Sequence, residues 1–449
     1  MSSNNFLPEV KEQYEVLPYP QRNPEDEQNR LISTVACPLP LINHYLFRGQ
    51  QTFQQNFRCL VAGGGTGDAA IFLAQQLKEY GGQVVYLDLS NASQTIAKKR
   101  AEIRGLDNIE FHQGSLLDVS DMGLGEFDFI NCSGVLHHLE DPEAGLTQLK
   151  SVLKASGGMS IMVYALHGRA SVYQMQELMR LANDGVSDKA LQITNGRRLW
   201  DSLPEYHIIK AQNPAFKSEI TAGGDSGLYD LFLHSQDRAY SIPQLYQWFD
   251  DCEVDLVTLI GSAGQKNRYR IEKHIADPAI FQQFKSKSVP EQQAMAELLD
   301  GRIIKHTAFV THKNRDCSIA STTNIDNIPF FYNLSIEGDK LPQIMQSNPG
   351  RAVHLSFGAA GELVVPSSIP KAALLRYMDG ETSLENIFIR AKKYLAKSGK
   401  QVDIDRLKKE FDELFESFAH FDFMLLRGKD IPRYKSASEL QALMTERCK

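Results

Sequence analysis

Three glycines and one carboxylate in the first quarter of the chain have the spacing of a nucleoside-binding site. Gly63, Gly65 and Gly67 follow the apolar run at residues 59–62, and glycine lets a backbone turn sharply and pass close to a ligand. The amides that open the following helix favour anionic or polar ligand groups. Asp88 stands 21 residues after Gly67, near the spacing of roughly 20 residues at which a carboxylate accepts both ribose hydroxyls. The pattern predicts a pocket for an adenosine.

The glycine pattern alone leaves the adenosine cofactor open, because residues 65–70 also fit the dinucleotide fingerprint G-x-G-x-x-A. A dinucleotide-dependent oxidoreductase and a non-catalytic sensor of an adenosine ligand are therefore alternatives. Residues 109–118, 127–139 and 152–164 favour a third class. Their order and spacing resemble those of the class I S-adenosylmethionine-dependent methyltransferases, of the bacterial type 11/12-like kind, over about residues 57–165.

The resemblance implies S-adenosylmethionine as the cofactor and gives roles to particular residues. It implies that Gly63, Gly65 and Gly67 face the methionine part and that Asp88 holds the ribose. It also implies that the adenine edge meets Ser115 and Leu116, and that Cys132 lines the methyl-donor side. Two positions depart from the family pattern, with Val61 in place of an acidic residue and Ser115 in place of a frequent Asp.

Methyl transfer from a sulfonium needs a protein mainly to align the nucleophile and exclude water, so a general base is optional. His137 and Tyr164 follow two predicted strands at the edge of the pocket and are the candidate catalytic residues; a histidine that only packs under the loop is the alternative. The candidate substrate contacts are Tyr19, His234, Arg238 and Tyr240. An Asp–Arg pair that only fastens the insertion is the alternative for Arg238.

Those residues require a sheet whose strands all end at one edge. Strands and helices alternate over residues 57–164, and the runs 254–260 and 303–311 add two further strands. We therefore predict an α/β fold, a seven-stranded doubly wound, Rossmann-like sheet with helical insertions, plus a small α+β C-terminal domain.

Three regions follow from this pattern. Residues 1–55 form an N-terminal arm or lid, proline-stiffened and extended over residues 14–24. Residues 56–313 form the methyltransferase domain, with insertions at about 166–240 and 268–300. After a polar linker, residues 328–449 form a C-terminal winged-helix-like or accessory domain.

Composition limits the partners. A net charge of −7 argues against a general polyanion binder. Residues 132–135 are Cys-Ser-Gly-Val, where nucleotide methylases carry Asn/Asp-Pro-Pro-Tyr, which argues against methylation of a base amino group or a glutamine amide. We expect a small-molecule or protein acceptor, and no nucleic acid or membrane partner. Homodimerisation through the C-terminal domain is possible. Six dispersed cysteines predict neither disulfides nor a metal site, and no leader or membrane span is apparent, so we expect a cytoplasmic protein.

Overall fold

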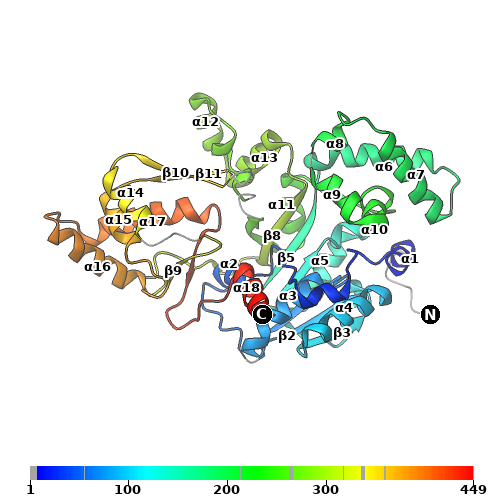
Figure 1. Ribbon diagram of the computed structural model, residues 1–449, viewed down its shortest axis with the longest axis horizontal. Coiled ribbons are helices and arrows are strands. Elements are labelled where there is room, and N and C mark those ends of the chain that lie inside the picture. Colours follow the sequence, from blue (N-terminus) through cyan, green and yellow to red (C-terminus); the bar gives the residue numbers. More distant parts are fainter. Residues whose placement is uncertain are drawn as a thin grey trace. The chain divides into compact units, whose positions relative to one another are not determined.

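The computed structural model describes residues 8–54, 56–212, 214–261, 266–316, 318–334, 339–357 and 361–447. The chain divides into two compact units (Figure 1). The first unit comprises Met1–Thr34, Phe53–Leu256 and Tyr269–Asn314, and the second comprises Val35–Thr52, Val257–Arg268 and Arg315–Lys449.

The first unit is organised around a mostly parallel sheet with the order β3-β2-β1-β4-β5-β8-β7. The strands are β1 (Arg58–Ala62), β2 (Gln83–Asp88), β3 (Ile109–Gln113), β4 (Phe127–Ser133), β5 (Leu153–Ala165), β6 (Ala239–Tyr240), β7 (Val254–Ile260) and β8 (Lys305–His312). Strand β8 runs antiparallel to β5. The predicted α/β, Rossmann-like class is confirmed. The strand count is eight rather than seven, because the short β6 pairs with the end of β5.

Three helices connect the parallel strands: α3 (Asp68–Leu77), α4 (Asn91–Arg104) and α5 (Pro142–Ser151). Strand β1 is buried from Cys59 to Ala62, as expected of a strand covered on both faces. Helix α5 ends just before β5, whose first residue, Leu153, pairs with Phe127 before the register shifts.

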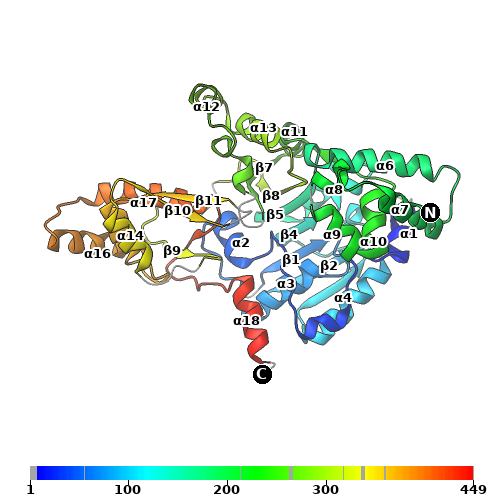
Figure 2. The same ribbon diagram turned by 45° about the horizontal axis from the view of Figure 1, so that its top comes forward.

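The long insertion folds into helices (Figure 2). These are α6 (Ala170–Ala182), α7 (Lys189–Ser202), α8 (Ile208–Gln212), α9 (Pro214–Ala222) and α10 (Gly224–Leu228), followed by one π-helical turn, Tyr229–Leu233. Trp200, Phe216 and Phe232 are members of a hydrophobic cluster of their own. Helix α11 (Ile242–Asp251) follows this long insertion. Helices α12 (Pro278–Lys285) and α13 (Val289–Asp300) lie within the second insertion, at about 268–300.

The N-terminal segment differs from the predicted extended arm. Residues Pro8–Val16 form helix α1, so Tyr14 lies in a helix. The chain becomes extended only near Pro18 and Pro20, because proline removes an amide donor and restricts the residue before it. A short 3₁₀ helix, Pro24–Gln28, follows.

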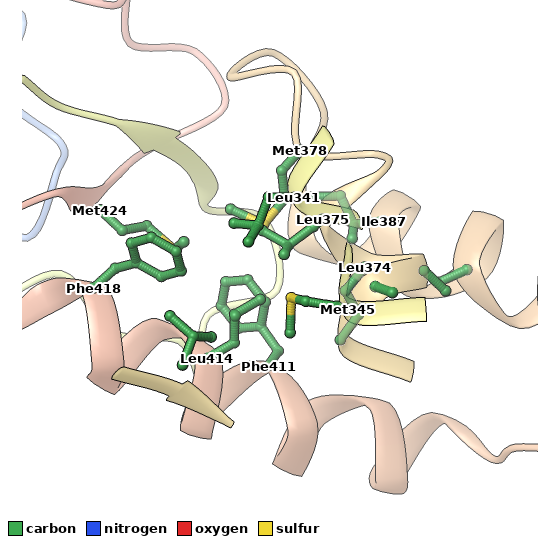
Figure 3. Close-up of a cluster of buried hydrophobic side chains, with 14 of the residues drawn as sticks. Leu341, Met345, Leu374, Leu375, Met378, Ile387, Phe411, Leu414, Phe418 and Met424 are labelled. Atoms are coloured by element: carbon green, nitrogen blue, oxygen red, sulfur yellow. The ribbon is translucent and has the colours of Figure 1, made fainter. Parts of the chain in front are cut away.

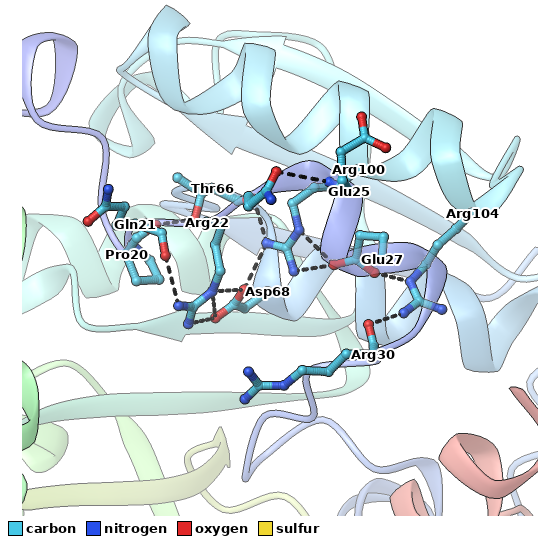
Figure 4. A network of polar contacts seen from close by, with 11 residues as sticks. Pro20, Gln21, Arg22, Glu25, Glu27, Arg30, Thr66, Asp68, Arg100 and Arg104 are labelled. Carbon is cyan, nitrogen blue, oxygen red and sulfur yellow. Dashed lines mark hydrogen bonds and ion pairs between the residues drawn. The ribbon is translucent and has the colours of Figure 1, made fainter. Parts of the chain in front are cut away.

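A buried ionic network fastens this segment to the first unit (Figure 4). The side chain of Arg100 is 1% exposed and donates to Glu27 and Asp68, in each case at 2.8 Å. Arg22 donates to Asp68 at 2.9 and 2.6 Å, and Arg104 also bonds Glu27. Buried guanidinium groups with several carboxylate bonds hold a fixed geometry. The segment that precedes the sheet is therefore fixed beside helices α3 and α4.

The second unit is a small α+β assembly, as predicted. It contains α2 (Leu39–Leu46), β9 (Ile328–Phe331), α14 (Lys340–Ser347), β10 (Ala352–Ser356), β11 (Glu362–Pro366), α15 (Ile369–Leu375), α16 (Leu384–Lys397), α17 (Ile404–Ala419), β12 (Met424–Arg427) and α18 (Ala437–Arg447). Strand β10 pairs with β11, and β9 pairs with β12, both antiparallel. Phe411, Leu414 and Phe418 of α17 are central to its core (Figure 3).

The division into units departs from the predicted arm at residues 1–55. Helix α2 belongs to the second unit, where the Leu426 amide donates to His44 Nδ1 at 3.1 Å and Tyr45 bonds Asp422. Every residue of α2 is buried. The unit that contains the C-terminal domain therefore also needs a segment from near the N-terminus.

Two further sequence expectations can be compared with the structure. Within the described ranges, no helix has both the length and the apolar character needed to cross a membrane. Four buried cysteines of the described residues, at positions 37, 59, 132 and 252, are not joined in disulfides. Cys317 and Cys448 lie outside the described residues.

Candidate cofactor and acceptor site

A cavity of about 410 Å³ lies at the carboxyl ends of the parallel strands of the first unit. Its lining includes Gly63 to Gly65 after β1, Leu87 to Leu89 around the end of β2 and Gly134 after β4. The strand order reverses between β1 and β4. In open α/β sheets the ligand binds in the crevice at this switch point.

The glycine loop needs glycine for two separate reasons. Gly63 and Gly65 have φ angles of 72° and 50°, in the left-handed region that favours glycine. A Cβ on Gly65 would lie 2.7 Å from the Tyr19 carbonyl oxygen, and one on Gly63 would lie 2.2 Å from a Val135 methyl carbon. Gly67 does not line the cavity; a Cβ there would lie 2.9 Å from the Cβ of Ala97 on α4. Gly67 therefore serves helix packing.

Asp88 joins the glycine loop to the end of β2. Its Oδ2 accepts from the Gly65 amide at 2.7 Å, and its Oδ1 accepts from the Ser90 amide at 2.8 Å. Burial raises the pKa of Asp88, and these two amides oppose that rise. A carboxylate offers about four acceptor sites, so the Asp88 side chain keeps lone pairs that the two hydroxyls of a ribose fit.

Ser115 and Leu116 line the same cavity, whereas Cys132 does not. Asn131 and Ser133 line it instead, because successive side chains of a strand point to opposite faces. Burial raises the pKa of the Cys132 thiol to about 12. The two neighbours of Cys132, rather than Cys132 itself, therefore line the cavity.

A buried carboxylate between two tyrosines forms the other side of the cavity. The Tyr14 hydroxyl donates to Asp230 Oδ1 at 3.2 Å, and the Tyr164 hydroxyl donates to Oδ2 at 3.3 Å. Asp230 is 4% exposed, and burial raises its pKa to about 6. All three side chains line the cavity. Sequence reasoning placed Tyr164 here, but Asp230 was not among its candidate site residues.

His138, rather than the predicted His137, lines the cavity. The His138 Nδ1 atom lies 2.7 Å from the Gln236 carbonyl oxygen. A carbonyl only accepts, so Nδ1 carries the proton and Nε2 keeps a free lone pair. Burial lowers the pKa of His138 to about 4, so this ring is neutral at pH 7.

His137 is completely buried, and neither of its ring nitrogens has a hydrogen-bond partner among the described residues. Its ring packs 4.0 Å from that of Tyr164. The 3₁₀ turn Leu136–His138 turns consecutive side chains in different directions. This placement corrects the assignment of His137 as the catalytic histidine.

His234 lies behind His138 and outside the cavity lining, with the two rings stacked at 3.9 Å. Its Nε2 lies 3.3 Å from the Tyr14 hydroxyl, and its Nδ1 accepts from the Gln236 amide at 3.1 Å. The ligand atoms of His138, Asp230 and His234 lie within 4.8 Å of one another. Tyrosine hydroxyls and the Gln236 backbone already bond these groups, so we assign no metal here.

The remaining predicted substrate contacts divide into two groups. Tyr19 lines the cavity, and its hydroxyl donates to Glu219 at 2.7 Å. Arg238 lies outside the cavity, 54% exposed and 3.7 Å from Glu143, and Tyr240 stacks on Trp248 at 4.8 Å. The structure therefore corrects the placement of Arg238 and Tyr240 at the acceptor.

Comparison with known proteins agrees with this geometry. Residues 60–159 match the family model of a methyltransferase domain. An uncharacterized protein from Synechococcus sp. is 31% identical over 256 residues, which cover 56% of this chain and 60% of the relative. The tRNA 5-carboxymethoxyuridine methyltransferase of Escherichia coli is 38% identical over 115 residues, covering 25% and 42%. The chain thus spans less than two thirds of the length of either relative.

A solved structure resembles a larger part of the chain. PKMT2 from Rickettsia typhi covers 94% of this chain and 77% of its own, with a TM-score of 0.57 and 16% sequence identity. The same protein in complex with AdoHcy gives a TM-score of 0.56, at 15% identity. At this identity the likeness concerns the fold alone.

The sheet order, the glycine loop and the family match define a methyltransferase domain of the Rossmann-like class. The chain thus contains a methyltransferase domain of the class I, S-adenosylmethionine-dependent kind, matched over residues 60–159, and S-adenosylmethionine is the cofactor that its glycine loop and Asp88 fit. This result removes the support for a dinucleotide-dependent oxidoreductase, which rested on the fingerprint alone.

Proposed function

We propose that the protein transfers the methyl group of S-adenosylmethionine to a nucleophile placed beside Tyr14, His138, Tyr164 and Asp230. The acceptor is a small molecule or a side chain of a protein or peptide. The observation that carries this proposal is the buried Asp230 carboxylate, which two tyrosines hold at the wall of the cofactor cavity. Bound S-adenosylmethionine supplies an electrophilic methyl group.

The residues of the chain have three tasks in this proposal. The glycine loop and Asp88 hold the cofactor, and the buried walls of the cavity exclude water. Asp230, with a pKa of about 6, is ionised at neutral pH and can accept a proton from a hydroxyl or amine acceptor. His138 Nε2 offers a second proton acceptor on the same wall. Tyr14 and Tyr164 fix the orientation of the Asp230 carboxylate.

Neither relative identifies the acceptor. The match to the Escherichia coli tRNA methyltransferase covers 25% of this chain, so it supports the cofactor half of the site. The mildly acidic composition disfavours a polyanionic acceptor. The cytoplasmic location and dimerisation through the C-terminal domain remain predictions.

Calorimetry and a transfer assay test this proposal. Wild-type protein should bind S-adenosylmethionine and S-adenosylhomocysteine but not nicotinamide dinucleotides. It should also pass tritium from [methyl-³H]S-adenosylmethionine to at least one fraction of an extract of its own cells. Asp230→Asn should bind the cofactor normally and lose most of the transfer. Cofactor binding without transfer to any fraction would favour the non-catalytic sensor, and absence of cofactor binding would refute the proposal.

A further inference from the structure

Arg169 is a buried cation whose hydrogen-bonding capacity is largely unused. It is 3% exposed and lines the cavity. Its guanidinium carbon lies 3.5 Å from the centre of the Tyr164 ring. The Nε and Nη2 atoms have no hydrogen-bond partner in the described part of the chain, and Nη2 is 3.8 Å from Asp237 Oδ2. Because unpaired buried donors are costly, a ligand that bonds them would gain affinity.

Lys305 places a second cation on the same wall. It is the first residue of β8, and its Cα is paired with that of Tyr164 on β5. Directly paired residues point their side chains to the same face of a sheet, and both line the cavity. Among the residues that the structure describes, the side-chain ammonium of Lys305 makes no hydrogen bond or ion pair. Burial also lowers its pKa.

The carboxylates of this region are already engaged. Asp230 accepts from two tyrosines, Glu219 accepts from Tyr19, and Asp237 accepts from Gln176 at 3.0 Å. Each carboxylate thus has a hydrogen-bond donor within the protein. On the same wall, the Nε and Nη2 atoms of Arg169 and the ammonium of Lys305 have no hydrogen-bond acceptor among the described residues, which indicates that they serve a bound group.

We propose that the methyl acceptor is an anion whose carboxylate or phosphate group is bound by Arg169 and Lys305 beside Tyr164. This inference rests on the proposed methyl transfer and specifies the class of its acceptor. A guanidinium matches the two oxygens of a carboxylate or phosphate, and an ammonium adds a point charge. The anion satisfies the free donors of Arg169 and leaves the reacting atom of the acceptor near Asp230.

Matched pairs of small probes test the inference on the full chain saturated with S-adenosylhomocysteine. The pairs are benzoate with benzamide, and phenyl phosphate with phenol. The acid of at least one pair should raise the melting temperature at millimolar concentration, and its neutral counterpart should not. A response to benzoate alone would indicate a carboxylate acceptor, and a response to phenyl phosphate alone a phosphate acceptor.

Three variants connect that response to the site. Lys305→Gln should weaken binding of the anionic probe about tenfold to a hundredfold, as expected for loss of a charged hydrogen bond. Lys305→Arg should retain most of the binding. Lys217→Gln changes an exposed lysine of α9 that does not line the cavity, and it should have no effect. Arg169→Lys provides a second test if the Lys305 variants do not fold.

The inference is overturned if no anion is preferred over its neutral partner, or if Lys305→Gln and Arg169→Lys both keep the full response. Affinity for S-adenosylhomocysteine is measured first on each protein. If the wild-type protein does not bind S-adenosylhomocysteine, the proposed function is refuted. If it binds S-adenosylhomocysteine but prefers no anion, this inference alone is refuted.

Discussion

Replacing Asp230 with Asn should make the protein more stable at neutral pH while impairing methyl transfer. Asp230 is buried, and burial is the main cause that raises its pKa from 3.8 to about 6. The nearby Arg169 partly opposes that rise. Asn has nearly the same shape but carries no charge. Tyrosine hydroxyls both donate and accept, so Tyr14 and Tyr164 can keep their bonds to the amide.

The size of the effect follows from the difference in pKa between the folded and unfolded chain. At about pH 3 and below, the carboxyl is largely protonated in both states and contributes little. Between about pH 4 and 6 the unfolded chain releases its proton first, so the free energy of unfolding falls as the pH rises. A shift of about two units corresponds to about 3 kcal/mol above pH 6, at 1.36 kcal/mol per unit.

Thermal melts of the cofactor-free protein between pH 4 and pH 8 measure this difference. Asp230→Asn should melt about 5 °C above wild type at pH 8, and the gap between the two curves should narrow toward pH 4. Asp225→Asn is the matched control, since Asp225 forms an exposed pair with Arg197; exposed pairs contribute little. A variant less stable than wild type at pH 8, or a gap that does not change with pH, would refute the reasoning.

Three further predictions concern the cofactor, the two units and the surface. Asp88→Asn should weaken S-adenosylhomocysteine binding about tenfold or more in calorimetry. The Asn side chain has one accepting oxygen in place of two, so it cannot accept every hydrogen bond that the Asp88 carboxylate receives. The Gly65 amide is one such donor, and the exposed Asp107→Asn should bind normally. A chain ending at Asn314 should aggregate in size-exclusion chromatography, since α2 would lose its partners in the second unit; a soluble monomer would contradict this. Arg238→Ala should change neither melting temperature nor transfer, and a fall in transfer would return Arg238 to the acceptor.

The cofactor half of the site could be predicted from the sequence because it is local. Gly63, Gly65 and Asp88 belong to one strand–helix–strand unit, and the turn between its first strand and helix has a strict requirement for glycine. Hydrophobic periodicity also predicted the parallel strands and the α+β character of the C-terminal region. Each of these features depends on contacts between neighbouring segments.

Local patterns could not decide between neighbouring residues that have similar chemistry. His137 and His138 differ only in the direction that a 3₁₀ turn gives them, and Cys132 points away from the cavity because strand faces alternate. The position of the Arg238 side chain depends on its ion pair with Glu143, which lies nearly a hundred residues earlier in the sequence.

The tertiary structure determined the side of the cavity that we assign to the methyl acceptor. Tyr14, Tyr164, Asp230 and Lys305 come from the N-terminal helix, strand β5, the π-helical turn and strand β8. No spacing in the sequence joins them, because their proximity depends on the packing of the helical insertion and on the antiparallel pairing of β8 with β5. The sequence by itself determined how the chain holds an adenosine cofactor, through a short strand–turn–helix segment. Only the folded chain determined which charges and hydroxyls line the wall where we propose that the acceptor binds, because long-range packing brings them together.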